Sequence, residues 1–136
     1  MEWNVLVSAA QDAANSAYVP YSHYSVGAAA LVDDGRLVAG CNVENASYGL
    51  TLCAECGMVS SLIASGGGRL VAFTCVNGMG EVITPCGRCR QLLLEHGGST
   101  MKMLTPDGES TLGDLLPQAF GVYDLQDYAA REETSG

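Results

Sequence analysis

The sequence predicts a single α/β domain over residues 1–136, in which a few helices pack on a sheet of about five strands. This length fits one compact domain and leaves little room for a second. Hydrophobic residues make up 48% of the chain and charged residues 15%, so the chain can build a core. Helical and extended patterns follow one another in the order αββαβαβ, which is typical of helices layered on a sheet.

The first part of the chain predicts a helix followed by a β-hairpin. Apolar side chains recur at helical spacing over residues 3–17, which indicates a helix with one apolar face. Residues 25–32 and 36–43 flank the turn sequence Asp33-Asp34-Gly35, and this arrangement indicates two antiparallel strands. A polar loop is expected over residues 44–52.

The second part predicts two further helices, each near a buried strand. We expect a helix from about Cys53 to Ala64, ended by the glycines at 66–68, and then a strand over 69–76. Pro85 suits the start of the next helix, because its missing amide hydrogen costs nothing there. The remaining expected elements are the body of that helix to about His96, a strand over 101–104 and a fifth strand near residue 110.

The charge balance narrows the range of partners. Six Lys and Arg residues against fifteen Asp and Glu residues give a formal net charge of −9. This charge argues against nucleic acid or an anionic membrane surface as the main partner. The first residues lack the positive flank and apolar run of a signal peptide, and no stretch approaches the roughly 18 apolar residues of a membrane span. We therefore expect a soluble, cytoplasmic protein.

The six cysteines divide into two kinds. Cys41 and Cys75 stand alone in apolar, β-branched stretches, and we expect both to be small buried hydrophobic residues. The other four form two Cys-x-x-Cys pairs at residues 53–56 and 86–89. Without an export signal the compartment is expected to be reducing, so metal binding or catalysis is favoured over disulfides.

The paired cysteines predict a metal centre. Both pairs fall where a loop enters a helix, and the positive end of a helix favours the thiolate that binds metal. Cys86 and Cys89 share one helical face, and Cys53 begins the other helix. Three thiolates and a water form a tetrahedral zinc site with an open position. Glu55 is too close to Cys53 to share its metal, but it can accept a proton from that water.

An alternative is a closed structural zinc site formed by all four paired cysteines. The double Cys-x-x-Cys pattern fits such a site, although the separation of the two pairs exceeds the usual 15–20 or so residues. A closed site would leave Glu55 without a water to activate. In contrast, Cys53-Ala54-Glu55 together with the Pro85–Cys89 segment matches the zinc-deaminase signature in its three-cysteine form.

From about Tyr18 to Phe120, the chain resembles the small homotetrameric cytidine deaminases of pyrimidine salvage. The resemblance rests on five segments in the same order, Pro20–Ala28, Cys41–Gly49, Cys53–Glu55, Pro85–Gln91 and Leu115–Phe120. It implies a three-layer α/β/α sandwich with a mixed sheet and one Zn²⁺ per subunit. The implied reaction is hydrolytic deamination of free cytidine and deoxycytidine to uridine and deoxyuridine, with release of ammonia. A deaminase of the same fold acting on another cytosine-bearing molecule is the nearest alternative.

The resemblance also implies a role for individual residues. It implies that zinc is bound by Cys53, Cys86 and Cys89, that Glu55 transfers protons and that Arg90 lies near the thiolates. It implies that the ribose is bound by Asn42 and Glu44, that the backbone of Ala54 contacts the base and that Tyr24 packs on the nucleoside. It also implies that neighbouring subunits contribute Tyr48 and Phe120 to the site. From the residues alone, Asn42 and Glu44 could instead be loop caps. Tyr24 and Phe120 could likewise be core or interface aromatics.

Cys56 departs from the family pattern, which usually has arginine directly after the catalytic glutamate. Zinc with three thiolates carries a net negative charge, which opposes the formation of hydroxide, and a nearby arginine would offset that charge. We expect Cys56 to stay neutral beside the site and to donate a weak S–H hydrogen bond to a ligand sulfur. Arg90 and the amides at the helix ends would then offset the negative charge of the zinc and its three thiolates, in place of the arginine that the family has at this position.

Overall fold

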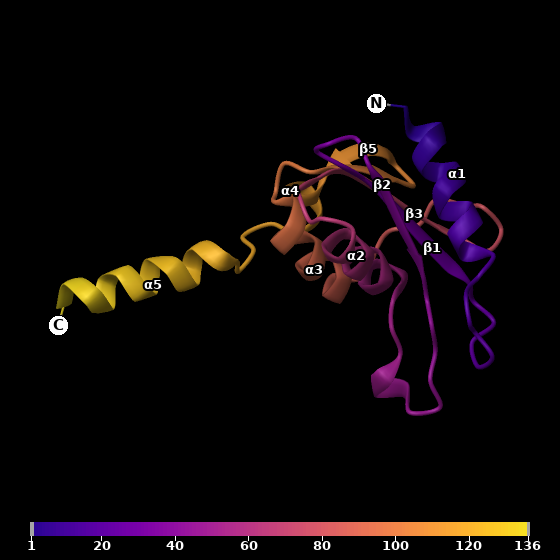
Figure 1. Cartoon of the computed structure of the whole chain (residues 1–136), viewed down its shortest axis with the longest axis horizontal. Helices are drawn as coiled ribbons and strands as arrows, with labels where there is room; N and C mark the ends of the chain where they lie inside the picture. The colour runs from indigo at the N-terminus through magenta and orange to yellow at the C-terminus, as the bar shows by residue number, and fades with distance from the viewer. Residues whose placement is uncertain (1, 136) are drawn as a thin grey trace.

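The computed structural model describes residues 2–135 and shows helices packed on a central sheet (Figure 1). The elements in chain order are α1 (Trp3–Ala14), β1 (Val26–Val32), β2 (Leu37–Cys41), the 3-10 turn η1 (Tyr48–Leu50), α2 (Ala54–Ala64), β3 (Leu70–Asn77), α3 (Gly87–Gly97), β4 (Lys102–Thr105), β5 (Gly108–Thr111), α4 (Leu112–Leu115) and α5 (Val122–Ser135). The predicted order of helices and strands is therefore confirmed as far as β5.

The five strands form one mixed sheet in the order β2-β1-β3-β4-β5. β1 pairs antiparallel with both β2 and β3, and β4 pairs antiparallel with β5. β3 and β4 are parallel, because α3 connects them across the sheet. The hairpin predicted from Asp33-Asp34-Gly35 is present, with Leu31 opposite Leu37 next to the turn.

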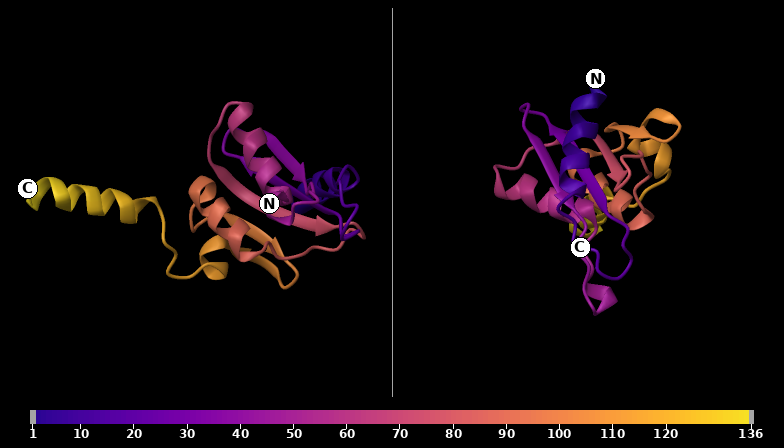
Figure 2. Two further views of the ribbon diagram at one scale, coloured as in Figure 1. Left: turned by 90° about the horizontal axis from the view of Figure 1, so that it is seen from below. Right: turned by 90° about the vertical axis from the view of Figure 1, so that its right-hand side faces the viewer.

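The alternating side chains of β1 pack on helices on both faces of the sheet. Ala28 and Ala30 belong to the core under α2 and α3, together with Met58. Ala29 points to the opposite face, where it packs with Leu6 of α1. The sandwich is therefore three-layered, with α1 on one side and α2 and α3 on the other (Figure 2).

Two glycines allow the helices to lie directly against the strands. A Cβ at Gly40 in β2 would overlap the amide nitrogen of Met58 in α2. A Cβ at Gly27 in β1 would likewise overlap the carbonyl oxygen of Ala10 in α1. The close contact at Gly40 fixes the height of α2 above the sheet, and with it the position of the residues at the start of α2.

Some boundaries differ from the sequence predictions. The first helix ends at Ala14 rather than at residue 17, because Tyr18 already pairs with Val43 as an isolated bridge. The 14-residue helix α5 was not predicted. It extends away from the rest of the molecule (Figure 1), with Tyr123 80% exposed and Tyr128 64% exposed. Among residues 2–135, no helix combines the length and the apolar character needed to cross a membrane.

The two isolated cysteines have different environments. Cys75 in β3 is fully buried, as predicted. Cys41 at the end of β2 is only half-buried, so the prediction of a buried residue is wrong there. The difference arises because β2 is the edge strand of the sheet, whereas β3 lies between β1 and β4.

Candidate metal centre

Three thiols converge at the start of two helices. The Sγ atoms of Cys53, Cys86 and Cys89 all lie within 4.8 Å of one another. Cys53 is the N-cap residue of α2, and Cys86 is the N-cap residue of α3, both with extended backbone conformations. Cys89 lies in the first turn of α3 and is 1% exposed. The two helix starts therefore bring together cysteines that are far apart in the sequence.

The donor set fits a zinc ion. Thiolates about 2.3 Å from one zinc ion lie within this separation of one another. Burial raises the pKa of the Cys53 thiol, and burial together with the Glu55 charge raises the pKa of the Cys89 thiol. Partial burial acts to raise the pKa of Cys86, but hydrogen bonds from Cys89 lower it overall. A divalent cation would keep all three sulfurs deprotonated together.

Cys56 lies outside this group of thiols. Within residues 2–135, the cysteines that meet at this distance are Cys53, Cys86 and Cys89 alone. Cys56 is half-buried in the first turn of α2, where its amide donates to the Cys53 carbonyl oxygen at 3.0 Å. The arrangement favours a three-cysteine centre with an open fourth position over the closed four-cysteine site.

Glu55 lies beside the three thiols in the first turn of α2. It is 4% exposed, and it lines a pocket of about 220 Å³ together with Cys53 and Cys86. Its charge and a hydrogen bond to it help to raise the pKa of the Cys89 thiol, which places the carboxylate next to that ligand. The N-terminus of α2 favours a negative charge at this position. A buried carboxylate next to the open position can exchange protons with a molecule bound there.

The rest of the pocket comes from loops and strand ends. Ala54 lines it as the first residue of α2, and Asn42 lines it just after β2. Further residues line the pocket that the sequence did not indicate as site residues, and these are Val26, Thr51, Leu52, Ile83, Thr84 and Pro85. The available sequence signal was the position of Ile83 to Pro85 directly before Cys86.

Asn42 and Glu44 both hold the loop that precedes β1. Asn42 accepts from the Val26 amide and donates to the Tyr24 carbonyl oxygen, each at 2.9 Å. Glu44 Oε1 accepts from the amides of Tyr21, at 3.0 Å, and Ser22, at 3.1 Å. Asn42 faces the cysteine pocket, whereas Glu44 lines an adjoining hollow. The interpretation of Asn42 and Glu44 as loop caps is therefore confirmed, because both side chains bond to the backbone of this loop.

The predicted aromatic residues lie away from the cysteine pocket of their own chain. Tyr24, Tyr48 and Phe120 are 49%, 78% and 61% exposed. The Tyr48 ring packs edge-on against Tyr21, with 6.2 Å between the ring centroids. Phe120 is held through its carbonyl oxygen, which accepts from Gln91 Nε2 at 2.7 Å. Within one chain, these rings leave the pocket open to solvent.

Arg90 holds backbone carbonyls around the start of α3. Its Nε donates to the Pro85 carbonyl oxygen at 2.9 Å, and its Nη1 donates to the Leu115 carbonyl oxygen at 3.1 Å. The guanidinium is therefore bonded to the segment that carries Cys86 and to the end of α4. A position of Arg90 near the thiolates stays a prediction.

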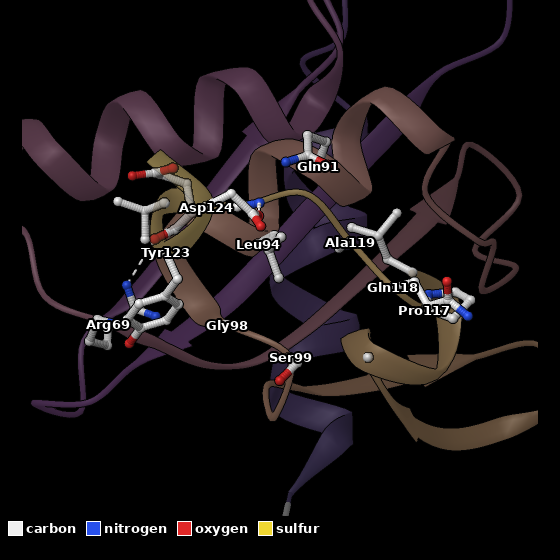
Figure 3. Close-up of a pocket in the computed structure, with 15 residues that line it drawn as sticks. Arg69, Gln91, Leu94, Gly98, Ser99, Pro117, Gln118, Ala119, Tyr123 and Asp124 are labelled. Atoms are coloured by element: carbon white, nitrogen blue, oxygen red, sulfur yellow. Dashed lines mark hydrogen bonds between the residues drawn. The ribbon is translucent and has the colours of Figure 1, made fainter. Parts of the chain in front are cut away.

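A larger cavity than the cysteine pocket lies elsewhere in the molecule. It has a volume of about 690 Å³ and is lined by residues of α3, the segment after α4 and the start of α5 (Figure 3). Arg69 lies on its wall and donates to the Glu95 carbonyl oxygen at 2.8 Å. Cysteines are not among its lining residues within the described chain, so it is separate from the metal centre.

A sandwich with a cysteine metal centre and a buried carboxylate defines a zinc-binding domain of the hydrolytic deaminase class. Residues 2–105 match the family model described as the cytidine and deoxycytidylate deaminase zinc-binding region. The chain belongs to this family.

Named relatives cover nearly the whole chain. A cytidine deaminase of Mycobacterium tuberculosis is 63% identical over 125 residues, which are 92% of this chain and 94% of that protein. A cytidine deaminase of Halalkalibacterium halodurans is 39% identical over 93% of this chain and 100% of that protein. The crystal structure of the M. tuberculosis cytidine deaminase superposes with a TM-score of 0.87, at 63% identity, over 90% of this chain and 99% of that chain. The corresponding crystal structure from Mycobacterium leprae gives a TM-score of 0.85 at 58% identity, over 87% of this chain and 99% of that chain.

Proposed function

We propose that this chain deaminates free cytidine and deoxycytidine by hydrolysis, giving uridine and deoxyuridine plus ammonia, in pyrimidine salvage. The observation that carries the proposal is the buried carboxylate of Glu55 beside three converging thiols. Cys53, Cys86 and Cys89 would hold one zinc ion per subunit. When bound, zinc acts as a Lewis acid that makes a water molecule acidic enough to react near neutral pH.

Glu55 moves the protons in this proposal. Its carboxylate takes a proton from the attacking water and passes it to the ring nitrogen of the cytosine. The water oxygen bonds to the ring carbon that carries the amine. Glu55 then takes the remaining proton from this added hydroxyl and transfers it to the exocyclic amine, so that the carbon–nitrogen bond breaks, ammonia leaves and the carbonyl group of the product forms. Burial supports this role, because a carboxylate shielded from bulk water exchanges protons with the bound substrate rather than with solvent.

Polar residues around the pocket would orient the nucleoside. The backbone of Ala54 would contact the base, and Asn42 and Glu44 would bond the ribose hydroxyls. An amide nitrogen carries two donor hydrogens and a carboxylate has two oxygens, so each side chain can hold its loop and also meet a hydroxyl. Tyr24 would pack against the nucleoside once its ring turns toward the pocket. The net charge of −9 suits an uncharged nucleoside better than a nucleotide.

The active form in this proposal is a cytoplasmic homotetramer with sites shared between subunits. The exposed rings of Tyr48 and Phe120 support this part, because each would be buried by entering the open pocket of a neighbouring chain. Cys56 would stay protonated beside the ligands. Arg90 would keep the Cys86 segment in place through its two carbonyl contacts.

The test is an ultraviolet assay for loss of cytidine by the purified, zinc-loaded protein. Glu55→Gln should lower kcat by about 10²- to 10⁴-fold, because it removes the general base, and should leave the zinc content unchanged. Glu95→Gln is the matched control, since Glu95 is an exposed glutamate on α3 outside the cysteine pocket. A zinc-loaded wild-type protein without cytidine turnover, or a silent Glu55→Gln, would point instead to a deaminase of another cytosine compound or to a zinc module without catalysis.

A further inference from the structure

Cys75 is a buried cysteine to which the proposed reaction gives no role. It lies in β3, is fully buried and belongs to the core under α2 and α3. Its Sγ donates to the carbonyl oxygen of Ile83 at 3.2 Å. The Ile83 amide in turn donates to the Cys75 carbonyl oxygen at 3.0 Å. Two hydrogen bonds in opposite directions therefore tie these two residues together.

One wall of the cysteine pocket is formed by the segment Ile83–Pro85, which begins at Ile83. Ile83, Thr84 and Pro85 all line the pocket, and Cys86 follows directly. β3 pairs with β4 only at Ala72 and Phe73, so the edge of β3 beyond these residues is available to this segment. The segment runs back along that edge, where Val82 forms a bridge with Val76.

The wall is anchored at both ends. Cys75 holds Ile83 at its start, and Arg90 holds the Pro85 carbonyl oxygen at its end. Between these two anchors the segment has no regular secondary structure, so its position depends on them. A shift of the wall would change both the shape of the pocket and the direction from which Cys86 reaches the metal.

The thiol of Cys75 is suited to donate a hydrogen bond. Burial raises the pKa of the Cys75 thiol, and the charge of Glu55 and a hydrogen bond to it raise the pKa further. The sulfur therefore keeps its proton and does not act as a nucleophile. The same interactions place the thiol close to Glu55, which is also buried.

We propose that Cys75 is a positioning residue for the deamination site, whose thiol fixes the Ile83 carbonyl and so sets the pocket wall that leads to Cys86. The inference rests on the proposed function for its kinetic consequences. Cys75, on the central strand β3, would thereby belong to the residues that shape the site. Its hydrogen bond, rather than its volume, is the feature that matters.

The experiment compares three substitutions at Cys75 in the zinc-loaded protein. Cys75→Ser keeps a donor, Cys75→Ala removes the donor, and Cys75→Val removes it while restoring volume. The alanine and valine variants should lose about tenfold in kcat/KM with zinc content retained, because the partly buried Ile83 carbonyl loses this donor and the wall shifts. Cys75→Ser should stay within about threefold of the wild type, since its hydroxyl can bond the same carbonyl.

The matched control is Thr74→Val on the same strand. Thr74 is also fully buried, and its Oγ1 donates to the Leu104 carbonyl oxygen at 3.3 Å. It points to the opposite face of the sheet, because successive side chains in a strand alternate. This variant should lose a similar hydrogen bond and similar stability, but it should keep wild-type kcat/KM.

Hydrogen exchange at the Ile83 amide gives a readout that does not depend on turnover. Protection of this amide should fall in Cys75→Ala and Cys75→Val, and should be retained in Cys75→Ser and Thr74→Val. Wild-type kcat/KM in Cys75→Val, or equal losses in the serine and alanine variants with Ile83 still protected, would overturn the inference. If the wild-type protein does not turn over cytidine, the proposed function fails, and the exchange measurement still tests the contact between Cys75 and Ile83.

Discussion

The guanidinium of Arg90 donates to the carbonyl oxygen of Pro85, the residue directly before the metal-centre cysteine Cys86. Its second contact, to Leu115, ties the same side chain to the end of α4. Arg90 is thus positioned to fix the geometry of the Cys86 segment by a planar, two-pronged set of donors. A lysine would keep the positive charge but lose this arrangement.

Arg90→Lys should therefore weaken zinc binding by about tenfold, as is common when a residue that orients a metal ligand is replaced. Competition with a chromophoric chelator measures the affinity. Arg88→Lys is the control, because Arg88 lies exposed on α3 between the two cysteines. Wild-type zinc affinity in Arg90→Lys would mean that charge, rather than the carbonyl contacts, is what Arg90 contributes.

Gly40→Ala should lower the free energy of unfolding by at least about 2 kcal/mol, because the new methyl group would overlap the backbone of α2 at Met58. Denaturant titration of the zinc-loaded protein measures the change. Gly49→Ala is the matched control, since a Cβ there would meet no described atom within 4 Å. Equal stability of the two variants would show that α2 is not fixed by this contact.

Lowering the pH should loosen the loop before β1 only below pH 4.5, the ordinary pKa of a glutamate. Hydrogen bonds from the side chain of Ser22 and from the amides of Ser22 and Tyr21 hold the pKa of Glu44 below its ordinary value of 4.5. The carboxylate therefore contributes its full stabilisation above pH 4.5, and this is lost as the pH falls through the lowered folded-state pKa.

The amide resonances of Tyr21 and Ser22 report this change in a pH titration followed by NMR. Glu44→Gln keeps an acceptor oxygen but cannot titrate, so the same resonances should lose their acid transition. A transition above pH 4.5 in the wild type, or an unchanged one in Glu44→Gln, would contradict the role given to Glu44.

The proposed sharing of sites between subunits predicts that two impaired variants can rescue each other. Phe120→Ala would lack the ring supplied to a neighbour, and Glu55→Gln would lack the proton acceptor. In a mixed oligomer, a subunit with intact Glu55 can receive an intact Phe120 from its neighbour, which should restore about a quarter of wild-type activity when the subunits assemble at random. Co-expression with two different tags isolates the mixed species. A mixed oligomer no more active than its parents would refute site sharing.

The parts of the fold predicted from the sequence are those set by local pattern. The β1–β2 hairpin follows from two extended runs around Asp33-Asp34-Gly35, and the metal cysteines follow from their spacing at two helix starts. Contacts between distant segments leave no such signal. The bond from Arg90 to Leu115 spans 25 residues and fixes a role that spacing alone did not indicate.

The helix α5 is a different case. Its apolar residues, including Leu125 at 62% exposed, lie outside the core of their own chain, so packing within this chain does not determine it. The strand β2 ends at Cys41 rather than at the predicted residue 43, because the Asn42 side chain bonds to the loop before β1. The end of β2 therefore depends on contacts between distant segments, whereas α5 lies outside the core of the chain.

We propose that three cysteines hold the zinc ion and leave one position for the reacting water. X-ray absorption spectroscopy at the zinc edge counts the ligands directly, and Cys56→Ser serves as the comparison. Three sulfur ligands and one lighter ligand are expected in both proteins, with turnover of Cys56→Ser within about tenfold of the wild type. Four sulfur ligands in the wild type, falling to three in Cys56→Ser, would contradict it.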